Sequence, residues 1–477
     1  MRMRIQGVLL FTTLNALIAT TAITANNEAN KNVNEQTNIA WSAQFEYEQL
    51  NMTMTHKQKI AFKITRIDRA WGQHFDVVFV HDNDAVACIE DVQTMYGITS
   101  GGKAFVKGNF TVNALLLGYT HVRVELHRRG GEYAKPERSR EFMKIIVTRK
   151  MSTIDMIFSI SVACFVMVIY INFGAVVDLE ALKQIVIRPV GPAIGLFCQF
   201  VVMPVLSFSI GYILFHDMIE LRLGLFFLGV SPAGGTSNIF AVLLNGNLSL
   251  SITMTAISNF AAFGMMPLWI FTLGALIFHD GNFVIPYKSI ASISFTLVIP
   301  IAMGIMLQKY APEVTKTISK LLKPVSLILI ISVTIFGCVL NSYMFKLFSV
   351  KILIGSCILP WLGYIIGWLI ATVLRQPPKD AITIAIETGI QNIGIAIFML
   401  NFTLPQPQAD MTSAVPIANS LVTPLPLFLI YFLKLCFCHK RGSKSVEEEA
   451  SAKDGKEYEL VAIMERGTEK ENPKYPQ

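Results

Sequence analysis

The sequence is poor in charged residues. Aspartate, glutamate, lysine and arginine make up only 15% of its 477 residues, whereas hydrophobic residues make up 53%. Soluble domains carry about a quarter charged residues, so this balance excludes an ordinary soluble protein and indicates a chain that crosses a membrane several times. The net charge of +7 does not indicate a nucleic-acid partner, because the basic residues stand in short clusters beside hydrophobic segments, where they set membrane topology.

Cysteine is scarce outside the hydrophobic region. Of the seven cysteines only Cys88 lies away from the apolar segments and their cytosolic edge, so we expect neither a disulfide framework nor a cysteine metal site. Cys436 and Cys438 are either palmitoylation sites or ordinary apolar residues. The sequence also lacks the motifs G-x-x-x-x-G-K-[ST], H-E-x-x-H and G-x-S-x-G, which argues against an ATP-driven pump, a common hydrolase and, more broadly, an enzyme.

The first 25 residues have the form of a secretory signal peptide. Arg2 and Arg4 give a basic start, a short apolar run follows, and small residues lead into a polar stretch. We expect cleavage between Ala22 and Ala25. An uncleaved signal-anchor is the alternative, although the apolar run is short for a membrane span.

Residues 26–148 contain no membrane-length apolar run. Apolar and polar residues alternate in Phe62–Ile67, His121–His127 and Phe142–Val147, and the run Phe75–Val80 is more continuously apolar. Several short strands separated by breaks that contain glycine and asparagine predict a small β-sandwich.

This β-rich segment carries two glycosylation sequons, N-M-T and N-F-T, so we expect glycans on Asn51 and Asn109 and an extracellular or luminal location. It has no catalytic constellation, and a role in binding or folding support is its default interpretation. At the other end of the chain, residues 439–477 are charged and lack apolar periodicity, which predicts a disordered cytosolic tail.

The hydropathy of residues 149–438 predicts an all-α polytopic membrane bundle of about nine spans. Nine crossings after an extracellular N-terminal domain leave the C-terminus in the cytosol, and most lysine and arginine clusters then fall on the cytosolic side. The plasma membrane is the expected location. The spans are expected near 153–173, 189–214, 219–245, 249–278, 288–308, 321–342, 351–374, 379–404 and 412–437.

Glu387 is the only acid placed deep inside a membrane-length apolar stretch. A carboxylate is costly there, so such a residue usually marks a path for an ion or a substrate. Thr388, Gly389, Gln391 and Asn392 follow it, and the glycine weakens the helix. A broken helix that presents a carboxylate, amide oxygens and freed carbonyl groups suits a bound Na⁺. The alternatives are a protonated glutamate or a polar residue that only packs between helices.

A second interruption lies in another apolar segment, where residues 231–238 read SPAGGTSN. A proline followed by two glycines does not remain a regular helix, and the freed backbone groups need partners that lipid does not offer. Two interrupted segments, one in each half of the region, are typical of a transporter with inverted repeats. We therefore expect two broken helices that cross at the binding site.

Four stretches carry a resemblance to a known family. They are QFVVMP at 199–204, SPAGGTSN at 231–238, LSLSITMTAISNFAAFGMMP at 248–267, and 387–392. They resemble the sodium/bile acid cotransporter family in order and spacing over nearly all of 152–437, and the long ectodomain is similar to the less characterised branch of that family. The resemblance implies Na⁺ as the coupling ion, no other cofactor, and an amphipathic organic anion as the substrate.

The resemblance also implies a set of oxygen-bearing sodium ligands. The first sodium site would use Ser237, Asn238, Ser251, Thr255 and Glu387. The second would use Gln199, Glu387 and Gln391, with the backbone carbonyls of Thr388 and Ile390. The residues expected to face the substrate cavity are Asn238 and Asn392.

The spacing of Ser251 and Thr255, four residues apart, places both on one face of a helix. For either residue alone, a hydroxyl that only bonds back to its own helix is the simpler interpretation. Gly235 and Gly394 depart from the family pattern near the expected substrate cavity, which leaves the substrate open while the sodium ligands are kept.

These observations predict Na⁺-coupled symport of an amphipathic organic anion, such as a bile acid or a steroid sulfate, by alternating access. The partners would be Na⁺, the organic anion and membrane lipid. The alternative is a non-transporting membrane receptor or scaffold that uses its ectodomain to bind a partner. A decayed transporter would lose its costly buried polar groups first, and the whole set is present here.

Overall fold

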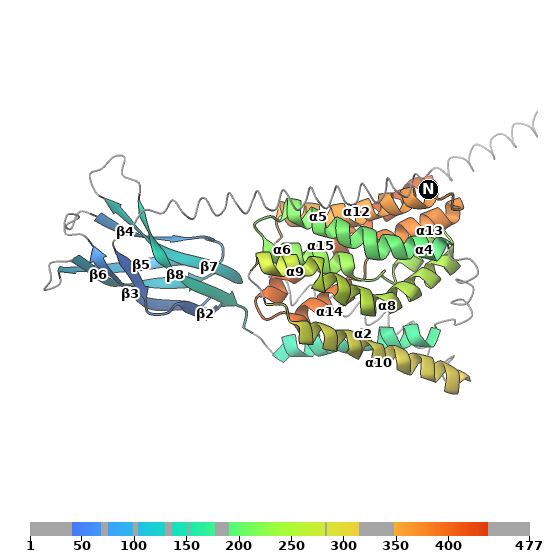
Figure 1. The fold of residues 1–477 in the computed structure, drawn as a ribbon, viewed down its shortest axis with the longest axis horizontal. Coiled ribbons are helices and arrows are strands. Elements are labelled where there is room, and N and C mark those ends of the chain that lie inside the picture. The colour runs from blue at the N-terminus through green and yellow to red at the C-terminus, as the bar shows by residue number, and fades with distance from the viewer. Residues whose placement is uncertain are drawn as a thin grey trace, which may run out of the picture. The chain divides into compact units, whose positions relative to one another are not determined.

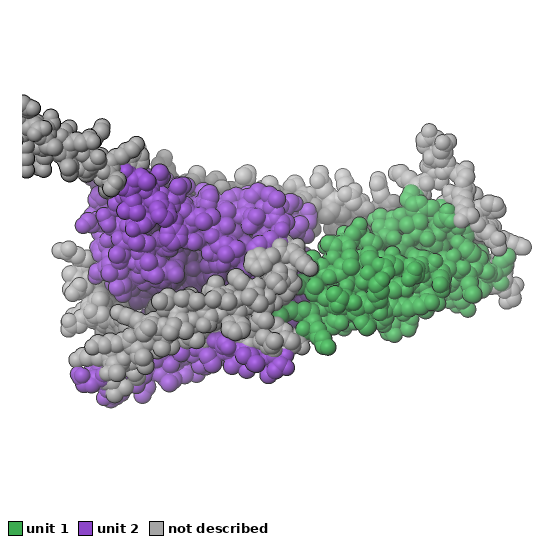
Figure 2. Space-filling view, turned by 180° about the vertical axis from the view of Figure 1, so that it is seen from behind, with its two compact units in different colours: residues 1–150 green, residues 151–477 purple. Residues whose placement is uncertain are grey.

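The computed structural model describes residues 41–67, 75–98, 104–128, 136–150, 153–176, 190–281, 284–313 and 348–436, which form strands followed by helices (Figure 1). The chain divides into two compact units between Lys150 and Met151 (Figure 2). The signal peptide expected at 1–25, the tail expected at 439–477 and the span expected at 321–342 lie outside the described residues.

The described part of the first unit consists of two four-stranded sheets (Figure 1). The strand order is β1-β3-β6-β5 in one sheet and β2-β8-β7-β4 in the other. The pair β2–β8 is parallel and the other pairs are antiparallel. The strands are β1 (Ser42–Phe45), β2 (Gln49–Thr53), β3 (Lys57–Ile67), β4 (Phe75–His81), β5 (Ala87–Ile98), β6 (Ala104–Ala114), β7 (Gly118–Arg128) and β8 (Glu137–Thr148).

Alternate side chains of these strands fill a core between the two sheets. On β3, Ile60, Phe62 and Ile64 are buried while the residues between them are exposed, as a strand with one solvated face requires. The ring of Phe79, from the other sheet, lies 4.9 Å from Phe62 and 4.5 Å from Phe110. The prediction of an N-terminal β-rich domain is confirmed, and the four runs that indicated strands lie within β3, β4, β7 and β8.

Both expected glycosylation sites lie on strands of this unit. Asn51 on β2 is exposed, and Asn109 on β6 is half-buried. Their neighbours Leu50, Met52 and Phe110 are buried, so the two asparagines point away from the core. Glycosylation stays a prediction.

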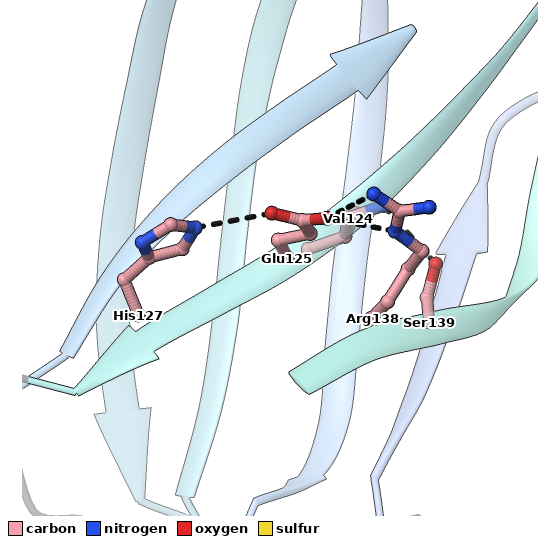
Figure 3. A network of polar contacts seen from close by, with 5 residues as sticks. All are labelled: Val124, Glu125, His127, Arg138 and Ser139. Carbon is pink, nitrogen blue, oxygen red and sulfur yellow. Dashed lines mark hydrogen bonds and ion pairs between the residues drawn. The ribbon is translucent and has the colours of Figure 1, made fainter. Parts of the chain in front are cut away.

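Glu125 on β7 is a buried carboxylate within the β-rich unit (Figure 3). Its Oε1 accepts a hydrogen bond of 2.7 Å from Nε of Arg138 on β8, and its Oε2 lies 3.1 Å from Nε2 of His127. Burial alone would raise the pKa of Glu125, but the bonds from Arg138 and His127 outweigh it and hold the pKa below its usual value.

The lowered pKa predicts acid sensitivity of the β-rich unit. A carboxyl whose pKa is depressed by folding contributes stability above its unfolded pKa, near 4.5, and loses that contribution as the pH falls through the folded value. Glu125→Gln should therefore destabilise a secreted segment of residues 26–150 at pH 7. We expect the free energy of unfolding to fall by about 1 kcal/mol. This is at the low end for a hydrogen bond to a charged group, because Arg138 is half-exposed.

Thermal unfolding between pH 7 and pH 3 measures this effect. The difference in unfolding temperature between wild type and Glu125→Gln should shrink below about pH 4.5. Glu48→Gln changes an exposed carboxylate and should have little effect on the unfolding temperature at any pH. A gap between wild type and Glu125→Gln that stays constant down to pH 3 would contradict this explanation.

The second unit is helical, as the sequence predicts for a membrane-type region (Figure 1). Within the described residues, four helical segments are long and apolar enough to cross a membrane: Val190–Leu214, Leu248–Phe271, Val350–Val373 and Gln408–Cys436. The number of nine spans stays a prediction.

The named helices of this unit follow one another in chain order. They are α2 (Thr153–Val176), α4 (Val190–Phe197), the π-helical turn η2 (Cys198–Val202), α5 (Met203–Leu214), α6 (Ile219–Val230), α7 (Ser237–Leu243), α8 (Leu248–Phe271), α9 (Leu273–Asp280), α10 (Tyr287–Tyr310), α12 (Val350–Val373), α13 (Pro378–Gly389), α14 (Ile393–Thr403) and α15 (Gln408–Val422).

One expected span is divided in the structure. The sequence predicts a single crossing over 249–278, but α8 ends at Phe271 and α9 begins at Leu273. Thr272 between them leaves the helical conformation, with φ −103° and ψ −91°, and its N–H bonds back to the carbonyl of Leu268. Gly274 lies two residues after Thr272, but the run around it stays apolar, so the local sequence gives only a weak signal of the break.

Helices α2 and α10 pack with their backbones in contact at two glycines. A Cβ added at Gly174 would lie 2.2 Å from the carbonyl oxygen of Ile301, and one added at Gly304 would lie 2.2 Å from that of Ile171. Membrane helices rely on such small residues because lipid tails provide no hydrophobic drive for helix pairing. The two helices therefore form a tight pair.

Candidate functional site

Two interrupted helices cross in the second unit. The first break separates α6 from α7, and the second separates α13 from α14. The N–H of Gly234 donates to the carbonyl of Ile390 at 2.9 Å, and the N–H of Asn392 donates to the carbonyl of Pro232 at 2.8 Å. Ala233 and Gln391 stand opposite each other as an isolated antiparallel bridge. Each break thus supplies the backbone partners that the other lacks, as a membrane interior requires.

The close approach of the two breaks explains why position 234 is a glycine. A Cβ added at Gly234 would lie 2.7 Å from the carbonyl oxygen of Gln391, a distance that no side chain tolerates against backbone. Neighbouring side chains satisfy two further backbone groups of the first break. Ala233 N–H donates to the hydroxyl of Ser258 at 2.8 Å, and Nε2 of Gln199 donates to the carbonyl of Ser231 at 2.7 Å.

Glu387 lies beside this crossing, near the end of α13, and only 1% of its surface is exposed. Three hydroxyl groups donate to its carboxylate: Ser237 at 2.7 Å, Thr255 at 3.0 and 3.1 Å, and Ser251. They come from α7 and α8, so three helices meet at one carboxylate. Among the described residues Glu387 forms no ion pair, and a buried charge of this kind needs compensation from a cation or a proton.

The first predicted sodium site is therefore brought together around one carboxylate. Its fifth member, Asn238, is half-buried, and its Oδ1 lies 2.8 Å from the hydroxyl oxygen of Ser251. Helices α8 and α13 run side by side here, because Asn247 N–H also donates to the hydroxyl of Thr383 at 2.7 Å.

Four of the five members of the second predicted sodium site meet at the crossing: Gln199, Thr388, Ile390 and Gln391. Oε1 of Gln391 accepts a hydrogen bond of 2.6 Å from Nε2 of Gln199, and Nε2 of Gln391 donates to the carbonyl of Thr388 at 2.7 Å. The carbonyl of Ile390 is the one that accepts from Gly234. Oε1 of Gln391 and the carbonyls of Thr388 and Ile390 are thus engaged by N–H donors in this structure.

Asn392, the other residue predicted to face a substrate cavity, caps a helix. Its Oδ1 accepts a hydrogen bond of 3.2 Å from the N–H of Ile395 in the first turn of α14, as asparagine does at a helix N-cap. Its side chain is half-buried. The role in substrate binding stays a prediction.

A sequence profile described as the Sodium Bile acid symporter family matches residues 163–348. The sodium-dependent organic anion transporter of Homo sapiens is 31% identical over 277 residues, which cover 58% of this chain and 73% of that protein. The chain belongs to the sodium bile acid symporter family. The hepatic sodium/bile acid cotransporter of Rattus norvegicus is 28% identical over 322 residues, 67% of this chain and 88% of the relative.

The chain is also similar to the P3 protein of Homo sapiens, which is 30% identical over 250 residues, 52% of each chain. This chain thus spans about half the length of that protein. The two relatives described before it bear names of transporters and not of enzymes, in agreement with the lack of enzyme motifs in this family member.

Sequence reasoning missed how Gln199 is positioned in this symporter-family chain. Pro204 has no N–H, so the carbonyl of Phe200 loses its usual helical donor, and the chain forms the π-helical turn η2 at Cys198–Val202. Nε1 of Trp269 on α8 donates to that carbonyl at 2.7 Å. Such π-turns are frequent at functional sites. The proline gave a signal in the sequence, but its distant tryptophan partner did not.

Ser258 was also missed. It lies seven residues after Ser251 and three after Thr255, on the same side of α8, and its hydroxyl holds Ala233 N–H at the crossing. The spacing of serine and threonine along α8 could have indicated a longer polar face than the sequence analysis assigned.

We predict that Trp269→Phe lowers the thermal stability of the purified protein in detergent. Phe200 is buried, and an unpaired buried carbonyl costs about 1–3 kcal/mol, so the unfolding temperature should fall by several degrees. Trp361→Phe is the matched control, because Trp361 is exposed and its hydrogen bond to Val422 is long at 3.4 Å. Equal effects of the two substitutions would contradict the role given to Trp269.

Proposed function

We propose that this protein is a Na⁺-coupled symporter of an amphipathic organic anion, such as a bile acid, a steroid sulfate or a related conjugate. One observation carries the proposal: a buried carboxylate, Glu387, is surrounded by the hydroxyl groups of Ser237, Ser251 and Thr255 beside two crossed helix breaks. The family membership and the names of two relatives, a sodium/bile acid cotransporter and a sodium-dependent organic anion transporter, support it.

In the first proposed sodium site, the hydroxyls that now donate to Glu387 turn their oxygen lone pairs toward the ion. Na⁺ is a hard cation that prefers oxygen ligands, and a hydroxyl serves as donor or acceptor by rotation alone. The ligands are Ser237, Asn238, Ser251, Thr255 and Glu387. Binding would replace three hydrogen bonds to the carboxylate by ion contacts and would neutralise its charge.

In the second proposed site, Na⁺ competes with the hydrogen bonds that the side-chain amides of Gln199 and Gln391 donate at the crossing. The ligands are Gln199, Glu387 and Gln391, with the backbone carbonyls of Thr388 and Ile390. Gln199 would release Oε1 of Gln391, and Gln391 would release the carbonyl of Thr388. Because Glu387 belongs to both sites and both breaks take part, ion binding would set the geometry of the crossing.

Sodium would drive the anion through charge as well as concentration. If two Na⁺ enter with one monovalent anion, one net positive charge crosses per cycle, and the membrane potential contributes about 2.3 kcal/mol per 100 mV. Asn238 and Asn392 would face the anion and donate hydrogen bonds to it. The chain would use nine spans with inverted repeats, in the plasma membrane, with its N-terminus outside and its C-terminus in the cytosol.

Alternating access would move the crossing region against the helix pair α2–α10. That pair is joined by the contact between Gly174 and Gly304, so it is suited to move as one body. The breaks instead depend on their mutual hydrogen bonds, which keep α6–α7 and α13–α14 together. Movement of one such body against another is how inverted-repeat transporters expose a central site to each side in turn.

The main test is Glu387→Gln. The amide keeps the volume of the side chain but removes the negative charge that balances the ions, so Na⁺-dependent uptake of a labelled steroid sulfate should fall to background. Asp380→Asn is the control, because Asp380 lies on the same helix two turns earlier and bonds Asn247, and it should retain most of the uptake. Uptake is measured in cells and divided by the amount of protein at the surface.

Two results would overturn the assignment of the site. One is wild-type sodium dependence in Glu387→Gln, and the other is an equal loss in both variants at equal surface expression. Absence of Na⁺-dependent uptake in the wild-type protein across bile acids and steroid sulfates would instead favour the receptor or scaffold function.

A further inference from the structure

Asn259 on α8 has a buried oxygen without a partner. The residue is 1% exposed, and its Nδ2 donates to the carbonyl of Thr255 at 2.7 Å. Its Oδ1 has no hydrogen-bond partner among the described residues. Buried polar atoms are nearly always paired, so this oxygen is available to a ligand or a water molecule.

The orientation of the Asn259 amide is fixed by its neighbour. Exchanging the positions of Oδ1 and Nδ2 would bring two acceptor oxygens, Oδ1 and the carbonyl of Thr255, to hydrogen-bond distance with no hydrogen between them. The amide nitrogen therefore faces the carbonyl of Thr255, and the oxygen points away from that carbonyl.

The helical spacing places this oxygen on the ion-binding face of α8. Ser251, Thr255 and Asn259 are four residues apart, so each lies about 40° round the helix and about 6 Å along it from the one before. The first two contact Glu387. Phe263, one further step in the same direction, packs its ring 6.0 Å from Tyr170 of α2. Asn259 thus faces the region between the Glu387 cluster and α2.

We propose that Oδ1 of Asn259 is a further sodium-coordinating oxygen, one helical turn from Thr255. The inference rests on the proposed symport function and deepens it. An amide oxygen is a ligand of the type that hard cations take. The helical rise sets Asn259 about 6 Å along α8 from Thr255, so this oxygen would bind Na⁺ on the path of the ion to or from Glu387.

The side of the helix supports an ion path and not only local packing. Ser258, on the other flank of Thr255, already bonds Ala233 at the crossing. Asn259 lies on the opposite flank, toward α2 of the glycine-joined pair, where the proposed movement opens and closes the site. A sodium ion that enters from that side would meet Asn259 before Glu387.

The test measures Na⁺ binding on the purified full-length chain in detergent, without transport. Thermal unfolding is recorded while Na⁺ replaces choline at constant ionic strength, since an ion that binds the folded state raises the unfolding temperature. Two variants remove Oδ1: Asn259→Leu also loses the bond to Thr255, whereas Asn259→Thr keeps a hydroxyl that bonds back to that carbonyl. Thr272→Val is the control, because Thr272 is exposed and only bonds back to Leu268 and Trp269.

Both Asn259 variants should raise the Na⁺ concentration for half-maximal stabilisation about fivefold, the loss expected for one neutral polar contact. Asn259→Asp, which keeps an oxygen and adds charge, should bring it back to the wild-type value or below. Thr272→Val should leave it unchanged.

An unchanged half-maximal Na⁺ concentration in Asn259→Thr would overturn the inference and assign the oxygen to a structural water. That outcome leaves the symport proposal standing, because wild type would still be stabilised by Na⁺. A wild-type protein that Na⁺ does not stabilise more than choline would instead overturn both.

Discussion

Backbone groups freed by a break in a membrane helix must find partners inside the protein, because lipid offers none. Here the two breaks provide them for each other, through the bonds from Gly234 to Ile390 and from Asn392 to Pro232. This mutual pairing allows both helices to be interrupted next to each other, beside the carboxylate of Glu387. It also explains why the first break needs a glycine at position 234, where a side chain would strike the second break.

The electrostatics of the site follow from that crossing. A buried carboxylate held by hydroxyls is satisfied by hydrogen bonds but is not neutralised. The same hydroxyl oxygens are ligands for a hard cation once they rotate. At the crossing, Nε2 of Gln199 donates to Oε1 of Gln391, and Nε2 of Gln391 donates to the carbonyl of Thr388. An arriving ion would therefore exchange contacts that already exist, so its binding would be coupled to the helices that carry those contacts.

Much of this arrangement could be predicted from the sequence, and the missing parts share a cause. Alternation in runs such as Phe62–Ile67 identified the β-rich domain, and proline, glycine and an isolated acid located the two breaks. The pairing between the breaks, the bond from Trp269 to the carbonyl of Phe200, and the turn at Thr272 were not predicted. Each depends on which side chain or backbone group faces another across the fold, and local sequence does not encode such distant partners.

The central claim is that a sodium gradient drives the uptake of an organic anion through this chain. The direct measurement uses the purified full-length protein in liposomes that contain choline, with a labelled steroid sulfate or bile acid outside and the membrane potential held at zero. An inward Na⁺ gradient should accumulate the anion above its external concentration, and an inside-negative potential should increase the accumulation further if net positive charge enters. Equal uptake under a K⁺ gradient, or uptake that never exceeds the external concentration, would contradict the account.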